Sequence, residues 1–516
     1  MKRLPSLASR LVFPSLLVAL AALINVTLNT AARVGRWSAL LGALPRASAA
    51  PRFVEWARDR FPYLATVVWA EKAPLLLTVL SRTQKDLELY AVDDKTLQVR
   101  RLLAEHGDAW VNLDQDVPKP LKDGSGFLWS SEQSGGRELE LRDLSSGALL
   151  RVLVPRAEGF RKLVHLDDQN GYATYAASPE PSEQQLFRVP LLGGAAVPLV
   201  SERGYLMASF GRAHDVYVVQ AFSAEQHART VVMRTPPGGL LASADQKVAE
   251  LPSVATPPPF LPRLELTQVG TQGFRVAIVR PRHFQAGKKY PVLVDVYGGP
   301  HHQQVLAMSG RYLLDQWLAD HGFIVIATDG RGTPARGTAW EQAIGGQSGG
   351  SFADIPLDDQ VSALQETAKR YPELDLSRVG IFGWSFGGYM AALAVLRRPD
   401  VFHVGVAGAP VVDWRDYDTG YTERYLGLPE ENKEGYDRSS LLTYAQNLRR
   451  PLLIVHGTSD DNVMFFHSMK LSHALFRAGK PHELLPLPGL THMVPDPVVT
   501  ERLWTRIASV LSGALK

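Results

Sequence analysis

The feature that most constrains the fold is a regular alternation of apolar runs and amphipathic segments from about residue 265 onward. KYPVLVDVYGG, FIVIATDGRG and PLLIVHGTSD are apolar runs that end in Gly or Asp, as strands buried on both faces do. RYLLDQWLADHG and LDDQVSALQETAKRYP have a helical period and lie between such runs. This alternation predicts a doubly wound, mainly parallel sheet with helices on both faces, where ligands bind at the carboxyl ends of the strands.

The preceding region, from about residue 62 to 250, has a different period. Four passages that begin at Leu75, Gly126, Gly171 and Asp215 each contain short alternating strands separated by polar or Gly-bearing turns. The last three recur at roughly 45 residues, the spacing of four-stranded propeller blades. We expect an all-β, propeller-like domain of about four blades, which must close on itself, pack on another domain or leave an exposed edge. A β-sandwich is the alternative.

Length and composition favour two domains. The 516 residues include 45% hydrophobic and 21% charged residues, as in globular proteins with packed cores. We place an N-terminal segment at 1–50, the truncated propeller-like domain at 51–264 and the α/β domain at 265–516, with the Pro-rich stretch Leu251–Leu264 between the last two. The net charge of +3 and the lack of a basic face argue against a nucleic-acid partner. The absence of cysteine excludes disulfides, a thiolate nucleophile and Cys-ligated zinc.

The N-terminus has the pattern of an export signal. Lys2, Arg3 and Arg10 precede the apolar run LVFPSLLVALAALI, and Ala47-Ser48-Ala49 offers a cleavage site. We expect a signal peptide or an N-terminal membrane anchor, and therefore a protein that is periplasmic, secreted or held at a bacterial inner membrane. The alternative is a helix of the mature fold.

One serine is a candidate nucleophile. The stretch GWSFG, with Ser385 at its centre, matches G-x-S-x-G and lies between the strand pattern RVGIF and a helical segment. This motif forms a sharp turn that lifts a serine hydroxyl above a sheet. Ordinary packing of a small residue in a tight turn is the alternative.

A serine needs a base, and the base needs an orienting acid. In this motif's fold the order along the chain is Ser, then Asp or Glu, then His. Asp460 follows the run PLLIVHGTS, and His492 lies in the loop after HELLPLPG. Both positions fall at the sheet edge where Ser385 is expected, whereas Asp461, next along the chain, is expected to be solvated or to cap a helix.

Catalysis by such a serine also needs donors for the oxyanion. The backbone N–H of Phe386, directly after the nucleophile, is one candidate. The second should come from the loop after an early strand, and VYGGPHH supplies the phenol of Tyr297 beside two glycines. A buried tyrosine without a catalytic role is the alternative.

Taken together, the motifs DVYGGP, DGRGTPARG, GWSFGGYM, APVVDWRDYDTGYTERYLG and HGTSDDNV resemble the prolyl oligopeptidase family of serine peptidases. The likeness is to its dipeptidyl peptidase IV branch, whose propeller also resembles WVNLDQD and GFLWSSE here. The resemblance implies an α/β-hydrolase domain with Ser385, Asp460 and His492 as the triad and Tyr297 with the Phe386 amide as the oxyanion hole. It also implies a proline-binding pocket and two groups that hold a substrate carbonyl: Tyr417, Tyr421, Trp414, Val411 and Val463, with Asn462 and Arg424.

The chain departs from that branch in two places. About half of the expected eight blades is missing, and no D-W-x-Y-E-E-E-like stretch, which carries the branch's paired glutamates for the substrate's α-amino group, precedes Trp110. The histidine loop GLTHMV also lacks the acidic residues that usually precede this histidine.

The sequence therefore predicts an exported serine peptidase that acts on peptides after Pro or Ala, with no metal or cofactor. An esterase or acylaminoacyl hydrolase with the same triad is one alternative, and a non-catalytic binding protein is another. Peptide substrates are the expected partners, and a membrane tether and a homodimer are left open.

Overall fold

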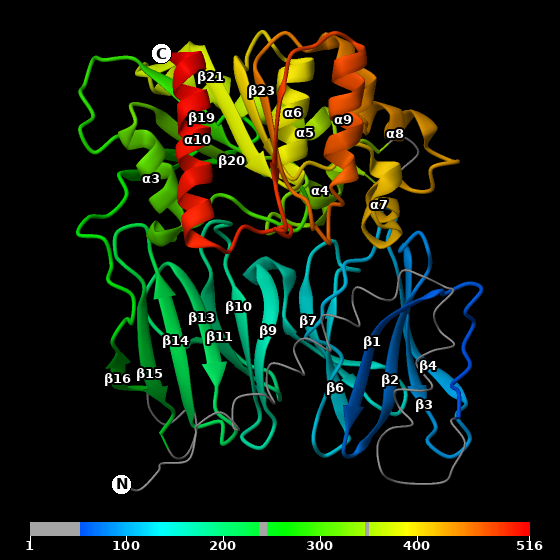
Figure 1. The fold of residues 1–516 in the computed structure, drawn as a ribbon. Coiled ribbons are helices and arrows are strands. Elements are labelled where there is room, and N and C mark those ends of the chain that lie inside the picture. Colours follow the sequence, from blue (N-terminus) through cyan, green and yellow to red (C-terminus); the bar gives the residue numbers. More distant parts are fainter. Residues whose placement is uncertain (1–51, 237–244, 346–349) are drawn as a thin grey trace, which may run out of the picture.

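The computed structural model describes residues 52–236, 245–345 and 350–516. Figure 1 shows four sheets side by side beneath a larger mixed sheet that is flanked by helices. The predicted N-terminal segment 1–50 lies outside the described residues. In the part of the chain that is described, no helix is both long and apolar enough to cross a membrane.

The N-terminal part consists of four sheets in series, each made of four consecutive antiparallel strands. The first sheet contains β1 (Tyr63–Ala70), β2 (Ala73–Leu80), β3 (Asp86–Val92) and β4 (Val99–His106). The second contains β5 (Lys119–Pro120), β6 (Gly126–Ser131), β7 (Glu138–Asp143) and β8 (Leu149–Val154). The third contains β9 (Phe160–Asp167), β10 (Tyr172–Ala177), β11 (Gln185–Pro190) and β12 (Val197–Pro198). The fourth contains β13 (Tyr205–Phe210), β14 (Val216–Phe222), β15 (Arg229–Arg234) and β16 (Gln246–Leu251).

Local turn chemistry explains why each sheet is a simple meander. Between β7 and β8, the Asp143 carboxylate accepts the backbone N–H of Ser146 at 2.7 Å, and Gly147 takes φ +76°. Asp93 plays the same part between β3 and β4 by accepting the N–H of Thr96 at 2.6 Å. Asp and Gly are the residues that such turns require.

Apolar packing joins neighbouring sheets. One core takes Leu89, Phe127 and Tyr175 from the first three sheets, and another takes Leu186 and Val219 from the third and fourth. The first and last sheets lie at opposite ends of the row in Figure 1. The predicted propeller-like array of four blades is confirmed, since the sheets stand in series and do not form the two facing layers of a sandwich.

The C-terminal part is one eight-stranded sheet in the order β17-β18-β20-β19-β21-β22-β23-β24. β17 and β18 are antiparallel to their neighbours, and the other strands run parallel. Its strands are β17 (Leu264–Val269), β18 (Phe274–Val279), β19 (Tyr290–Asp295), β20 (Ile324–Asp329), β21 (Leu374–Trp384), β22 (Val404–Gly408), β23 (Leu452–Gly457) and β24 (Glu483–Leu487). Its α-helices are α3 (Leu313–Asp320), α4 (Thr338–Glu341), α5 (Asp354–Arg370), α6 (Phe386–Arg397), α7 (Thr419–Leu426), α8 (Lys433–Ser439), α9 (Phe466–Arg477) and α10 (Pro497–Leu515).

Both faces of this sheet are covered, as the apolar runs predict. In β20, Ile324 and Ile326 join the core formed with α5, α6 and α9, whereas Val325 joins the core formed with α3 and α10. A strand with helices on both sides has a nearly continuous apolar run, because side chains on both faces are buried. The predicted α/β-hydrolase class is therefore confirmed, while the exact domain boundaries stay predictions.

The structure adds elements that the pattern did not predict. α7 and α8 lie between β22 and β23, where the sequence shows polar and aromatic residues with no sustained period. α10 begins at Pro497, where the Asp496 side chain caps it by accepting the N–H of Val499 at 2.9 Å.

Candidate active site

Ser385 occupies a strained turn at the carboxyl end of β21. Its backbone has φ +61° and ψ −119°, a conformation that costs a non-glycine residue on the order of 1 to 3 kcal/mol. Its N–H donates to the carbonyl of Gly408 at 2.8 Å. A Cβ at Gly383 or Gly387 would lie 2.3 or 2.1 Å from the carbonyl oxygen of Val296, so both positions require glycine. The turn thus presents the serine side chain at the edge of the sheet.

The predicted base and acid meet at the same edge. His492 Nδ1 lies 2.7 Å from Oδ2 of Asp460, and the His492 side chain is 14% exposed while that of Asp460 is fully buried. Because Nδ1 is engaged by the carboxylate, Nε2 is the nitrogen left for proton transfer. Asp461 is exposed, in keeping with its predicted solvated position.

Asp460 is held as a carboxylate by four groups. Its Oδ1 accepts the backbone N–H groups of Asn462 and Val463, both at 2.9 Å, and its Oδ2 contacts His456 Nε2 at 3.1 Å as well as His492. Burial acts to raise the pKa of Asp460, but the hydrogen bonds from His456 and His492 outweigh it and hold that pKa well below its ordinary value. The acid therefore stays ionised beside the histidine at neutral pH.

His456 is a support for this acid. It is completely buried, its Nδ1 lies 2.7 Å from Ser468 Oγ, and its Nε2 lies 2.7 Å from the carbonyl oxygen of Val463. With both nitrogens engaged, it has no position from which to reach a substrate. The sequence gave no sign that His456 would hold Asp460.

A hydrogen bond joins the loop that carries His492 directly to the turn that carries Ser385. Trp384 Nε1, one residue before Ser385, donates to the carbonyl oxygen of His492 at 2.8 Å. This bond joins residues 108 positions apart in the chain. It fixes where His492 lies relative to the serine.

The two residues that are predicted to supply the oxyanion donors, Tyr297 and Phe386, are neighbours in the fold. The Tyr297 ring is 5.8 Å from the Phe386 ring between centroids and 4.5 Å from the imidazole of His302. Gly299 approaches the Phe386 ring so closely that a Cβ there would lie 2.5 Å from it. Burial raises the pKa of the Tyr297 phenol, so it stays protonated and can donate.

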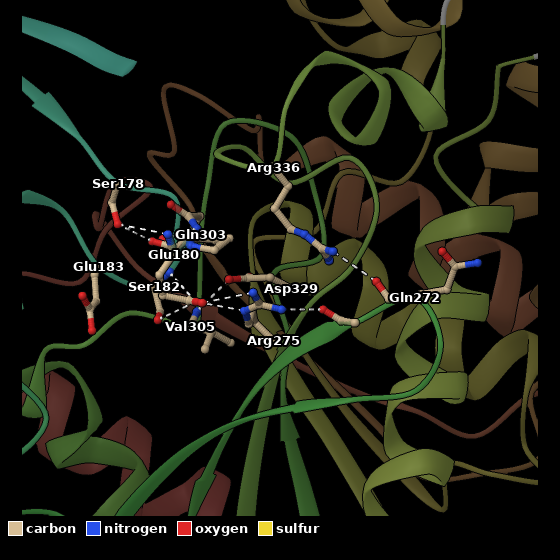
Figure 2. Close-up of polar contacts among 12 residues, drawn as sticks. Ser178, Glu180, Ser182, Glu183, Gln272, Arg275, Gln303, Val305, Asp329 and Arg336 are labelled. Carbon is tan, nitrogen blue, oxygen red and sulfur yellow. Dashed lines mark hydrogen bonds and ion pairs between the residues drawn. The ribbon is translucent and has the colours of Figure 1, made fainter. Parts of the chain in front are cut away.

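A buried carboxylate accepts hydrogen bonds from the loop that follows Tyr297. Asp329, at the end of β20, accepts the backbone N–H of Gln304 at 2.8 Å and of Val305 at 2.9 Å (Figure 2). Burial raises its pKa to about 6, against the effect of these two bonds. The DGRG motif that begins at Asp329 thus positions the loop that carries the candidate oxyanion donor Tyr297.

Aromatic side chains form a compact cluster beside this edge. Trp414 and Tyr421 are stacked, with centroids 6.0 Å apart and an interplanar angle of 15°, and Tyr417 meets Tyr421 edge-on at 5.5 Å. Phe352 packs on Trp414 at 4.4 Å and on Phe386 at 5.3 Å. The predicted pocket tyrosines therefore lie together. Phe352 connects their cluster to Phe386, the residue after Ser385.

The remaining predicted pocket residues surround this cluster in different ways. Val411 and Val463 are buried. Asn462 is exposed and accepts the hydroxyl of Tyr417 at 2.7 Å through Oδ1. Arg424, on α7, donates through Nη2 to the carbonyl of Val111 at 2.5 Å, and its buried Nε has no acceptor within the described residues. Arg424 thus also ties the pocket to the β domain.

Sequence reasoning missed two residues beside the predicted pocket, Trp110 of the β domain and His301 of the loop after Tyr297. Trp110 packs edge-on against Tyr425 at 4.9 Å, and its carbonyl accepts Gln342 Nε2 at 2.9 Å. His301 lies 6.3 Å from Tyr421 between ring centroids and contacts the Tyr425 hydroxyl through Nε2. The available signals were the motif WVNLDQD, which begins at Trp110, and the second half of VYGGPHH.

In the described ranges, no three side chains of the metal-ligating types gather in a way that could hold a metal ion. The arrangement consists of a serine in a strained turn, an ordered His-Asp pair, two candidate oxyanion donors and a cluster of aromatic side chains. Chemically it can carry out acyl transfer through a serine nucleophile.

Comparison with known proteins agrees with this geometry. A model described as the prolyl oligopeptidase family matches residues 313–512, and one of the dipeptidyl peptidase IV N-terminal region matches residues 46–226. Human dipeptidyl peptidase 8 is 35% identical over 61% of this chain, and pig dipeptidyl peptidase 4 is 33% identical over 49% of it. The chain covers only 36% and 33% of these two relatives' own lengths.

A solved structure extends the likeness through both parts of the molecule. Porphyromonas gingivalis dipeptidyl peptidase 4 superposes with a TM-score of 0.79 at 29% identity, over 88% of this chain and 64% of that one. The two family models, the relatives and the shared fold all indicate the same family. This chain belongs to the prolyl oligopeptidase family and has an N-terminal region of the dipeptidyl peptidase IV type.

Proposed function

We propose that this chain is a serine peptidase that cleaves peptides after Pro or Ala through a covalent acyl-enzyme. The observation that carries the proposal is the contact between His492 Nδ1 and Asp460 Oδ2 at 2.7 Å, in a loop that Trp384 fastens to the Ser385 turn. This arrangement orients an imidazole beside a serine in the manner that nucleophilic catalysis requires.

In the proposed mechanism, Nε2 of His492 takes the proton of Ser385 as Oγ attacks the scissile carbonyl. Asp460 stabilises the imidazolium that forms, and the Phe386 N–H and the Tyr297 hydroxyl donate to the oxyanion. His492 then gives its proton to the leaving amine, and water releases the acyl group by the same steps. Each role falls on a side chain or amide at the same sheet edge.

The aromatic cluster supports a preference for a proline ring before the scissile bond. Trp414, Tyr417 and Tyr421 present flat faces and edges to one another at 5.5 to 6.0 Å. A rigid pocket of this kind suits a compact pyrrolidine ring or a methyl group and excludes longer side chains. It also disfavours the esterase alternative, in which an extended acyl chain would have to enter.

The direct test is labelling and turnover. We expect a fluorophosphonate probe to label the protein at Ser385 and an Ala-Pro chromogenic amide to be hydrolysed. Ser385→Ala should lose both properties while keeping the wild-type melting temperature within a few degrees. A protein that takes up no label would be the non-catalytic binding protein, and faster turnover of a simple ester than of the Pro-amide would favour the esterase.

We also propose that the enzyme releases dipeptides and acts outside the cytoplasm, as the names of its relatives and its N-terminal sequence suggest. Dipeptide release requires recognition of a free α-amino group. Comparing Ala-Pro amide with its N-acetylated form tests this, because equal turnover of the two would indicate internal cleavage. Fractionation of the native host with an antibody tests export.

A further inference from the structure

A chamber of about 750 Å³ lies between the β sheets and the α/β domain. Residues from both parts line it, among them Asn112, Arg137 and Arg161 from the β sheets and Arg336 and Glu341 from the loop and helix after β20. This volume lies within the range of pockets that bind ligands of a few residues. None of the proposed catalytic residues lines it, so it is a separate space.

The lining is rich in arginine. Five arginines and two glutamates contribute to it: Arg137, Arg156, Arg161, Arg275 and Arg336, with Glu132 and Glu341. Arg275 is neutralised by Glu180, which it meets through two hydrogen bonds of 2.9 and 3.0 Å (Figure 2). Arg137 contacts Glu132 at 3.3 Å.

The other three arginines form no ion pair within the described residues. Arg161 donates to the carbonyls of Glu180 and Pro181 at 3.0 and 2.9 Å. Arg336 donates to the carbonyl of Gln272 at 3.1 Å, the one dashed contact that Figure 2 draws for it. The Nε of Arg161 and the Nη1 of Arg336 are buried without an acceptor. Buried guanidinium N–H groups without partners are costly unless an acceptor arrives.

Burial and neighbouring charges shift the pKa of two groups that line the chamber. Burial, together with Arg424 and Arg137, lowers the pKa of His301 to about 4, so this ring is neutral. Burial and the neighbouring Glu132 raise the pKa of Glu341 to about 7, so this carboxyl carries only part of its negative charge at neutral pH. The arginines are therefore not balanced by the acids around them.

The chamber adjoins the proposed active site. His301, which lines it, contacts the hydroxyl of Tyr425 and lies 6.3 Å from the pocket residue Tyr421 between ring centroids. Gln303, also in the lining, belongs to the loop that follows Tyr297. The chamber therefore borders the predicted proline-binding pocket.

We propose that the chamber binds carboxylate groups of a peptide substrate, and that Arg161 and Arg336 select peptides with acidic residues beyond the cleaved bond. The inference rests on the proposed peptidase function and names a substrate class for it. Guanidinium groups favour carboxylates because two parallel N–H groups match the two oxygens.

The test compares two peptides that begin with Ala-Pro and continue with either three Glu or three Gln residues. We expect the wild-type enzyme to cleave the acidic peptide with a kcat/KM roughly tenfold higher at low salt, as one or two buried charge-assisted hydrogen bonds would give. The ratio should fall as salt rises. Arg161→Gln and Arg336→Gln should each bring it toward one.

A matched control removes an arginine elsewhere. Arg282 forms an ion pair with Asp320 at 2.7 Å on the surface of the α/β domain, and Arg282→Gln should leave the ratio unchanged. Binding of both peptides to Ser385→Ala, followed by fluorescence anisotropy, gives a second measurement in case an arginine variant does not fold. Tighter binding of the acidic peptide there supports the inference.

A wild-type enzyme that cleaves both peptides equally at low salt would overturn the inference and leave the peptidase function intact. Failure to cleave either peptide, combined with no fluorophosphonate labelling of Ser385, would instead overturn the proposed function.

Discussion

Arg82, in the loop after β2, holds Glu423 of α7 with two hydrogen bonds of 2.7 Å. The Glu423 side chain is 4% exposed and that of Arg82 is 57% exposed, so the pair joins a surface loop of the first β sheet to the buried side of the helix that carries Tyr421 and Arg424. Gln84 adds a bond of 2.5 Å to the carbonyl of Gly420. The first sheet therefore holds α7, which supplies residues of the proposed substrate pocket, in place.

Removing that connection should weaken substrate binding. In Arg82→Gln the Glu423 carboxylate loses its charged partner, and we expect α7 to loosen and KM for an Ala-Pro amide to rise about tenfold, equivalent to about 1.4 kcal/mol. The value of kcat should change much less, because the triad lies on other elements. Steady-state kinetics measure both constants.

Arg398→Gln is the matched control, because it removes a surface ion pair with Asp400 at 2.7 Å on the α/β domain. Its KM should equal that of the wild type. The double variant Arg82→Gln/Glu423→Gln should recover part of the lost affinity, since no buried charge is then left unpaired. An unchanged KM in Arg82→Gln would show that α7 keeps its position without the β domain.

The backbone strain at Ser385 predicts a difference between two inactive variants. Ser385→Ala keeps a side chain at φ +61°, whereas Ser385→Gly removes the steric conflict. We expect the glycine variant to be more stable by about 1 kcal/mol, after allowing for the greater freedom of glycine in the unfolded chain. Chemical denaturation of both variants measures it, and a less stable glycine variant would contradict the strain.

The bond from Trp384 to the His492 loop should matter for rate. Trp384→Phe keeps an aromatic ring and loses the donor, so we expect kcat to fall about tenfold with little change in KM. Fluorophosphonate labelling should slow to the same extent. Trp504→Phe, on α10, is the control and should leave both rates as in the wild type. Equal kcat values for the two variants would show that the hydrogen bond from Trp384 to His492 does not contribute to the rate.

Glu341 should make stability depend on pH. Its pKa of about 7 in the folded protein lies above its ordinary value of 4.5, because of burial and the neighbouring Glu132. The folded state therefore binds this proton more tightly than the unfolded state, and its stability falls as pH rises from about 4.5 through 7. The loss should amount to about 1 to 3 kcal/mol.

Because the glutamine in Glu341→Gln cannot titrate, the test compares how the melting temperature of each protein changes with pH, and not the stability at a single pH. The melting temperature of the wild type relative to this variant should decrease between pH 4.5 and 8. Glu366→Gln, at an exposed ion pair with Lys369, provides a variant whose slope should match the wild type. Parallel curves for wild type and Glu341→Gln would contradict the raised pKa.

Much of the fold could be predicted from local patterns. Strands such as β20 begin with a continuous apolar run because both faces are buried, and α6 follows a G-x-S-x-G turn that sterics require to contain glycine at Gly383 and Gly387. The segment that holds α7 and α8 could not be predicted, because its helices are short and depend on tertiary contacts, which for α7 come from the β domain. Periodicity carries no record of such contacts.

The sequence by itself determined the order of the two architectures, the strained serine turn and the chain order of Ser385, Asp460 and His492, because each depends on residue type at short range. Only the tertiary structure decided that His456 would hold Asp460, that Arg82 would hold α7 and that arginines from two domains would line one chamber. These relations join residues that lie on different elements, and burial and packing bring them together only once the chain is folded. That is why the residues of the proposed triad can be recognised in short motifs, while the groups that position them and line the chamber cannot.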